Sequence, residues 1–362
     1  GSQGKPTFNY NGFAGIQQPT RYPDVMDGYQ YALTKNQAVQ NAGKPRQYSD
    51  QELEDIRTGR TPQTDWYGLT LNNQSFQTQH NISVNGGSEA IKYYLSLGYL
   101  DQDGMYDRIN FKKYSIRSNV DASINENLTI SADFDASTRD SRGSAYSPEA
   151  IFDDIIAAYP MDMAYNPDGT IFYTHEQHPV EEIKTGYNNN KINLLQATLS
   201  LKQNLPFIEG LSLSGKASFG REYTNNKLYN VPVLMNRQDA EGNTLEIYPY
   251  GGWNGKTALQ QNFDEYNTVT LNAAANYSRN FGDHDVSGLL LFEQFDAKAN
   301  NFYGFRTNFP AEGLDEFFYG GEAQKDANGG SFNDGRRSAV ARVNYSYKQR
   351  YLLEASFRSD GS

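Results

Sequence analysis

The chain contains no cysteine among its 362 residues, and this excludes a disulfide framework and any thiolate metal site. It also contains no run of about 18 apolar residues, which excludes a transmembrane helix. The net charge of -11 offers no basic stripe for phosphates, which argues against nucleic-acid binding. No Gly-rich phosphate loop and no convincing Ser/His/Asp set is present.

Hydrophobicity is scarce as well, whereas aromatic residues are plentiful. Hydrophobic residues make up 37% of the chain and the mean hydropathy is -0.75, too little for a large buried core. Aromatic residues nevertheless reach 14%, with 27 Tyr and 20 Phe. A disordered chain would be depleted in aromatic residues. The composition fits a structure with a wet interior and aromatic girdles on its outside.

Period-2 alternation is the main pattern in this sequence. In residues 114–124, Ile116, Val120 and Ala122 share one face, while Arg117 and Asp121 lie on the other. A short turn at 125–127 leads to the same pattern in 128–137. Such alternation predicts β-strands with one apolar and one polar face.

The connections between the expected strands alternate between tight turns and long loops. We count about eleven strands of about ten residues each, and the strand at 286–298 has apolar residues on both faces, which leaves its phase open. The pattern predicts an all-β, antiparallel transmembrane barrel with short turns on one side and long loops on the other. A soluble β-sandwich or propeller is the alternative, but it favours shorter strands or a fixed repeat.

Helix signals appear inside the expected loops. A first helix is expected at about 26–40, with Asp24 or Asp27 as its cap. Ser49 and Glu52 form a capping box for a second helix that ends at Gly59. Ser147 followed by Pro148 predicts the start of a third helix in the long loop 139–193.

Three polar motifs have features of reactive or metal sites, and we interpret each of them as structural. His175 and His178 are spaced i and i+3, whereas a helical zinc motif needs i and i+4, so we expect an exposed loop pair. The segment 101–104 resembles the start of a calcium loop, but its twelfth position is Lys112, so we expect a hairpin connection. Asp133 and Asp135 share a strand face and are expected to line a hydrated wall. We predict no catalytic residue, metal or cofactor.

Aromatic side chains in the long loops are the candidates for substrate binding. Sugars have apolar C–H faces that stack on flat rings, and loops on a rigid scaffold commonly carry function. The alternative is that these rings pack the loops together or contact a partner protein. The candidates are Tyr165, Phe172, Tyr173, Tyr248, Tyr250 and Trp253.

Several motifs in order along the chain resemble those of the SusC/RagA family of TonB-linked outer-membrane proteins. They are TDW at 64–66, QHNISVNGGS at 79–88, YYLSLGYLDQDG at 93–104, YSIRSNVD at 114–121 and FRSDGS at 357–362. The resemblance spans essentially the whole chain, and the ordered set is more specific than any single motif. The opening Gly1-Ser2-Gln3-Gly4 resembles the tail of a plug domain.

The resemblance implies that residues 1–6 end a plug domain and residues 7–362 form the N-terminal part of a barrel of about 22 strands. We interpret both ends of the chain as interruptions of a longer protein, because the plug, the TonB-contacting box and the later strands are not in it. Family membership implies TonB-energised import of oligosaccharides or peptides through the outer membrane, in contact with its lipid. A SusD-like surface lipoprotein would be the partner of the barrel. Alternatives are a TonB-dependent siderophore or cobalamin receptor, or a surface β-structured binding or adhesion protein.

Overall fold

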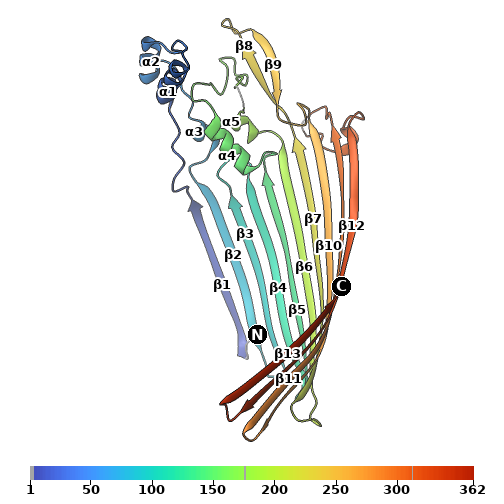
Figure 1. Cartoon of the computed structure of the whole chain (residues 1–362). Coiled ribbons are helices and arrows are strands. Elements are labelled where there is room, and N and C mark those ends of the chain that lie inside the picture. The colour runs from blue at the N-terminus through green and yellow to red at the C-terminus, as the bar shows by residue number, and fades with distance from the viewer. Residues whose placement is uncertain (1–3, 175–176, 312) are drawn as a thin grey trace.

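The chain folds around one large antiparallel sheet, seen in the computed structural model in Figure 1. The structure describes residues 4–174, 177–311 and 313–362. Within these residues, eleven strands pair in the order β1-β2-β3-β4-β5-β6-β7-β10-β11-β12-β13, so that neighbours in the sheet are also successive strands of the sheet along the chain. The sheet curls strongly at β11–β13 and stays open between β1 and β13. An all-β antiparallel barrel wall is therefore confirmed.

The strands of the large sheet are β1 (Gly4–Gln17), β2 (Ser75–Gly87), β3 (Ile91–Asp103), β4 (Asn110–Asn125), β5 (Leu128–Gly143), β6 (Tyr187–Asn204), β7 (Leu211–Asn230), β10 (Ala258–Phe281), β11 (His284–Thr307), β12 (Lys325–Tyr347) and β13 (Tyr351–Gly361). A separate hairpin, β8 (Val233–Gln238) with β9 (Thr244–Tyr250), rises from the connection between β7 and β10.

One face of the sheet is apolar, with aromatic rings at both of its ends. Directly paired residues of antiparallel strands share a face, and Ile116 stands opposite Leu97 and Ala136 on the apolar face. Toward the long loops, this face carries a chain of neighbouring rings from Tyr10 through His80 and Tyr99 to Tyr114. Toward the short turns it carries a second group of rings: His284, Tyr345, Tyr347 and Tyr351. Apolar strand residues between two aromatic girdles are typical of a surface that faces lipid.

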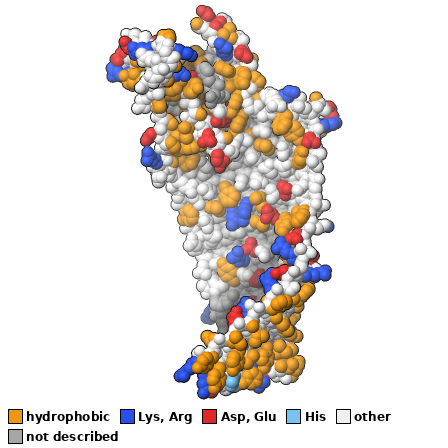
Figure 2. All heavy atoms as spheres, in the orientation of Figure 1, with side chains coloured by type: hydrophobic (Ala, Val, Ile, Leu, Met, Phe, Trp, Pro, Cys, Tyr) orange, Lys and Arg blue, Asp and Glu red, His pale blue; other side chains and the backbone are white. Residues whose placement is uncertain are grey.

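The other face is polar, and the contrast between the two is visible in Figure 2. Hydrophobic side chains gather at the lower end of the view, where β11 and β13 lie, whereas the surface above is largely polar and carries scattered charges. Paired residues on the polar face include Arg117 with Asp135 and Asn119 with Asp133. The curl of the sheet places this polar face on the inside, as in a barrel with a wet interior.

Turns and loops occupy opposite ends of the sheet, as the sequence predicts. Residues 88–90, 126–127, 205–210, 282–283 and 348–350 form the short turns. Residues 18–74, 104–109, 144–186, 231–257 and 308–324 form the connections at the other end, and they hold the helices and the small hairpin (Figure 1).

The expected strand length of about ten residues is wrong for most of this wall, because β7 has 20 residues and β10 and β11 have 24 each. As a result, the loop expected at 139–193 contains only residues 144–186. The alternation ends where the apolar face gives way to Asn, Lys and Glu, although the backbone pairing continues without a shift to Asn230 and Thr307. Backbone hydrogen bonds between the strands do not depend on side-chain polarity, so the pairing continues beyond the last alternating residues.

The expected helices form close to their predicted positions. They are α1 (Gly28–Asn41), capped by Asp27, α2 (Asp50–Arg57), capped by Ser49, and α4 (Pro148–Ala157), capped by Ser147. The short helices α3 (Trp66–Thr70), α5 (Pro179–Glu182) and η1 (Phe317–Tyr319) were not predicted from the sequence. Among the described residues, no helix is both long and apolar enough to span a membrane.

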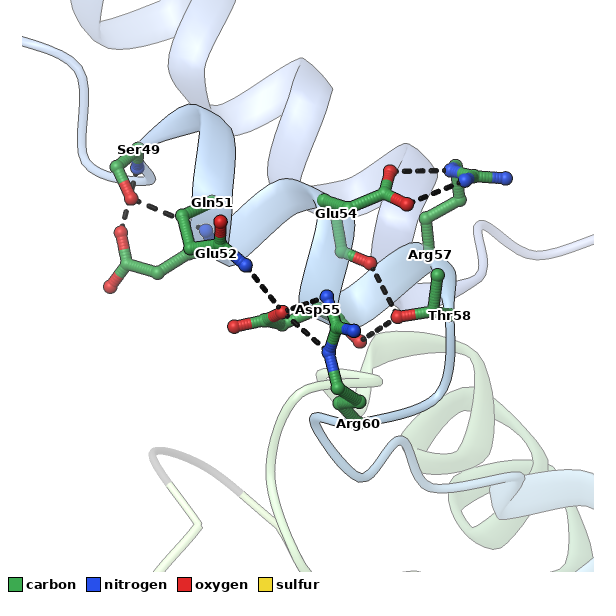
Figure 3. A network of polar contacts seen from close by, with 8 residues as sticks. All are labelled: Ser49, Gln51, Glu52, Glu54, Asp55, Arg57, Thr58 and Arg60. Atoms are coloured by element: carbon green, nitrogen blue, oxygen red, sulfur yellow. Dashed lines mark hydrogen bonds and ion pairs between the residues drawn. The ribbon is translucent and has the colours of Figure 1, made fainter.

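Helix α2 shows how local sequence fixes a loop element (Figure 3). The Ser49 amide donates to Glu52 Oε2 (2.7 Å), and the Glu52 amide donates to Ser49 Oγ (3.3 Å), which completes the capping box. On the exposed side, Arg57 pairs with Glu54 at 2.7 Å. The buried Leu53 and Ile56 pack with Ala32 of α1.

We expect the Ser49→Ala substitution to destabilise α2 by about 1 kcal/mol, because it removes the acceptor for a helix N-terminal amide. Hydrogen exchange of residues 50–57 should be about fivefold faster in this variant than in the unmodified protein. Ser88→Ala, in a short turn far along the chain, is the control and should leave that exchange unchanged. Unaltered exchange in Ser49→Ala would contradict a stabilising role for the cap.

Candidate functional site

Three of the connections at the long-loop end meet in one buried cluster. Trp66 of α3 meets Ile151 and Ile155 of α4, together with residues of two further segments: Tyr106, Ala164, Val180 and Ile183. Trp66 Nε1 donates to the Tyr159 carbonyl (2.9 Å), and the Thr64 hydroxyl donates to the Asp162 carbonyl (2.5 Å). Since the members come from three different loops, none of these loops holds its conformation alone.

His178 belongs to this buried cluster, which corrects the expectation of an exposed histidine pair. Its side chain is fully buried, its Nε2 lies 2.7 Å from the Ala164 carbonyl, and its ring meets Trp66 edge-on at 5.5 Å. Burial lowers the pKa of His178, so the ring is neutral near pH 7. His175 and Glu176 lie outside the described residues.

A pair of buried carboxyl groups lies beside the same cluster. Glu182 of α5 is fully buried, and its carboxyl interacts with that of Asp154 on α4 and with Tyr250 of the β8–β9 hairpin. Burial, with the Asp154 carboxyl as the second cause, raises the pKa of Glu182 to about 9. The protonated form of Glu182 is therefore favoured at neutral pH, since two charged carboxylates would otherwise be desolvated together. The pair connects loop 144–186 to the hairpin.

Most of the predicted loop aromatics meet at the contact between loop 144–186 and loop 231–257. Tyr173 lies edge-on to Tyr248 at 5.5 Å, and Phe172 forms a β-bridge with Asn236 of β8. Tyr250 stacks on Tyr146 at 6.4 Å. These rings therefore pack two loops against each other, which was the structural alternative in the sequence analysis.

Tyr165 and Trp253 occupy separate positions in these loops. The Tyr165 hydroxyl bonds with Glu181 (2.5 Å) and Lys184 (2.6 Å), and Trp253 lies edge-on to Phe305 of β11 at 5.0 Å. Trp253 is 47% exposed and Tyr248 is 43% exposed, so each keeps ring surface open to solvent. A substrate role for the six aromatic residues stays a prediction.

The polar face of the sheet carries a row of amide side chains just below these loops. Asn226 Nδ2 donates to Asn188 Oδ1 (2.6 Å), Asn262 Nδ2 donates to Asn226 Oδ1 (3.2 Å), and Gln260 Nε2 donates to Asn262 Oδ1 (2.9 Å). We call these four residues the amide ladder. The ladder was not predicted because its residues fall in the expected loops, although the runs Asn188-Asn189-Asn190 and Gln260-Gln261-Asn262 are a visible signal.

Farther from the loops, the same face is charged. A cavity of about 620 Å³ is lined by Lys113, Arg117, Arg139 and Asp135, among others. Arg117 Nε lies 2.8 Å from Asp135 Oδ2, and Asn119 donates to Asp133 (2.5 Å). The two aspartates thus sit in hydrogen-bonded contacts on the polar face, in agreement with the predicted hydrated wall.

No group of three His, Cys, Asp or Glu side chains could hold a metal ion in the described part of the chain. Asp101 and Asp103 end β3, and Lys112 lies on the neighbouring β4, where its Nζ is 3.2 Å from Asp101. The predicted hairpin connection is confirmed.

Comparison with curated proteins finds distant relatives along nearly the whole chain. No protein-family model matches. The TonB-dependent receptor SusC of Bacteroides thetaiotaomicron is 23% identical over 376 residues, which cover 99% of this chain and 35% of that protein. TonB-dependent receptor P26 of Formosa agariphila is 21% identical over 99% of this chain and 34% of its own length. The chain therefore spans about a third of the length of these relatives.

Solved structures show the same architecture. The RagAB peptide transporter superposes with a TM-score of 0.76 at 17% identity, over 98% of this chain and 42% of that one. The RagAB peptide importer in its open-open state gives a TM-score of 0.75 at 18% identity. These matches establish the fold, an antiparallel barrel wall with long loops at one end.

The curled sheet, its two aromatic girdles and its polar inner face thus have the architecture of an outer-membrane β-barrel, and along nearly its whole length the chain is similar to TonB-dependent receptors. The similarity includes SusC in sequence and the RagAB transporter in fold. In barrels of this architecture the short turns face the periplasm and the long loops face the exterior of the cell.

Proposed function

We propose that this chain is the N-terminal barrel part of an importer that takes up oligosaccharides or peptides through the outer membrane. TonB energises the transport, and a SusD-like surface lipoprotein closes the outer mouth. Residues 1–6 lead into the barrel from a plug domain, and residues 7–362 form its wall. The chain acts in transport and does not catalyse a reaction.

The polar inner face beneath a packed group of outer loops is the observation that supports this proposal most. A passive pore needs only a hydrated wall, whereas here Trp66, Tyr106 and Ile151 join loops of three different hairpins above the wall. Loops organised in this way provide a surface for recognition at the entrance. The similarity to SusC and to RagAB, whose title names a peptide transporter, adds support.

The proposal is tested by deleting the gene that encodes the full-length protein and measuring growth on defined carbon or nitrogen sources. We expect growth on one class of oligosaccharide or oligopeptide to fall at least about tenfold in rate, with growth on the monomer unchanged, because only the larger solute needs active uptake. Inactivation of TonB should reproduce this defect.

Two results would contradict the proposal. A growth defect confined to iron-limited or cobalamin-limited medium would identify a siderophore or cobalamin receptor. Normal growth on all of these sources, combined with loss of surface adhesion, would identify a binding or adhesion protein. Plasmid-borne wild-type protein is the matched control, since it should restore every phenotype of the deletion.

A further inference from the structure

The amide ladder lies on the inner wall, directly below the outer loops. Asn188, Asn226, Gln260 and Asn262 stand on three adjacent strands and have the same face as the polar residues Ser218 and Thr270. Asn226, Gln260 and Asn262 are half-buried, and Asn188 is exposed. Their amides face the interior of the barrel, on the path that a solute takes from the mouth.

An aromatic ring borders the ladder on the loop side. Phe305 stands directly opposite Gln260 in the sheet, and Trp253 of loop 231–257 packs edge-on against Phe305 at 5.0 Å. A backbone hydrogen bond from the Trp253 amide to the Lys256 carbonyl (2.8 Å) fixes the chain at this position. Phe305 thus stands between the half-exposed indole of Trp253 and the ladder residue Gln260.

A cavity of about 450 Å³ extends from the ladder beneath loop 144–186. Asn188, Asn190 and Asn226 line it from the wall, and Tyr106 and Tyr146 line it from the loops. The Asn190 Oδ1 and Tyr106 hydroxyl oxygens are buried and make no hydrogen bond with any described residue. A volume of several hundred Å³ with a few placed polar groups is typical of a small-molecule subsite.

From this arrangement we infer that the amide ladder, with Trp253, binds a neutral oligosaccharide. This inference rests on the proposed importer function and names its substrate class. Amide side chains both donate and accept, which matches the hydroxyl groups of a sugar, while an indole ring matches its C–H face. The site includes residues that lie on the wall itself, below the loop aromatics.

The charges around the ladder favour a neutral ligand. The four ladder side chains carry none, in contrast to the wall farther down, where Lys113, Arg117 and Arg139 gather. Asp264 and Asp326 border the ladder on the same face, and Asp326 accepts a hydrogen bond from Tyr303 (2.7 Å). Carboxylates there accept from sugar hydroxyls and repel an acidic ligand, and none of the four ladder side chains is a cation that could pair with the carboxylate of a peptide. Arg142, which also lines the cavity, is already paired with Asp140 at 3.1 Å.

The test is calorimetric binding to the purified full-length protein. The probes are maltohexaose, xylohexaose and a β-fructan hexasaccharide, with penta-alanine as the peptide probe. We expect at least one hexasaccharide to bind, and the double substitution Asn226→Leu/Asn262→Leu to weaken that binding by about tenfold or more, since it removes several hydrogen bonds. Trp253→Ala, which leaves the sheet untouched, should weaken it as well. Asn81→Leu, on the polar face of β2 away from the ladder, is the matched control.

Each outcome decides the inference. Weaker hexasaccharide binding in both ladder and Trp253 variants, with Asn81→Leu unchanged, supports it. Binding of penta-alanine with the same losses, hexasaccharide binding that none of the variants alters, or no binding of any hexasaccharide would overturn it. The proposed importer function is refuted by a separate result, namely that TonB-dependent growth on every oligomer persists after gene deletion.

Discussion

The Ala132→Arg substitution is expected to lower the free energy of unfolding in a lipid bilayer by about 2–4 kcal/mol, because it places a charge near the membrane midplane. Ala132 lies on the apolar face, opposite Val120 and Leu199, and midway between Leu128 and Ala136 on β5. The measurement is urea titration of the full-length protein in phospholipid vesicles, with the folded fraction read from its heat-modifiable migration in gels.

Ser131→Arg is the matched control for this prediction. Ser131 is the chain neighbour of Ala132 and faces the polar side, where its hydroxyl donates to Asp121 (2.6 Å). An arginine there remains hydrated and lies beside a carboxylate, so we expect a change of less than about 1 kcal/mol. Equal stability of the two variants would contradict the assignment of the apolar face to lipid.

The Glu182→Gln substitution is expected to remove most of the pH dependence of loop 144–186. The pKa of Glu182 is raised to about 9 in the folded loop, chiefly by burial, whereas the carboxyl of an opened loop has a pKa near 4.5. The folded loop thus binds more protons between these values, and its stability is greatest below pH 4.5 and falls as the pH rises toward 9. Glutamine keeps the shape of the side chain without the titration.

Hydrogen exchange of residues 148–174 at pH values from 5 to 9, corrected for intrinsic rates, measures this effect. In the unmodified protein we expect exchange by loop opening to accelerate by about tenfold or more over this range, and in Glu182→Gln by less than about threefold. Glu149→Gln, an exposed carboxylate on α4, should behave like the unmodified protein. The pairing with Asp154 would be refuted if Glu182→Gln kept the full pH dependence.

Local patterns in the sequence predicted the elements whose signals are complete within a few residues. The capping box at Ser49 and the Ser147-Pro148 start gave α2 and α4 because these contacts join groups three residues apart. The apolar alternation of β4 and β5 gave their faces for the same reason. The ends of the strands were not predicted correctly. The apolar alternation reflects contact with lipid and therefore stops at the membrane surface, whereas the backbone pairing continues beyond it.

Strand β11 is a case in which the sequence alone did not predict which side chains face lipid. Leu289 to Phe292 is apolar on both sides of the strand, so the sequence left its phase open. Pairing resolves it, because Leu290 stands between Ala275 and Ala341, and Phe292 stands between Ala273 and Ala339. Leu290 is 65% exposed on the lipid side. The register of β11 with its two neighbouring strands therefore shows which of its side chains face lipid, and the sequence of β11 alone does not.

The sequence by itself determined the class of fold, the order of strands, the sides of the short turns and long loops, and the SusC/RagA-type resemblance. It did so because residues two, three or four apart fix strand faces and caps. The tertiary structure alone decided which loop aromatics pack together, that His178 is buried, and that Glu182 meets Asp154 and Tyr250. It also brought Asn188, Asn226 and Asn262 into one ladder. These contacts join residues tens of positions apart, and the register of the paired strands together with the packing of the loops sets such distances.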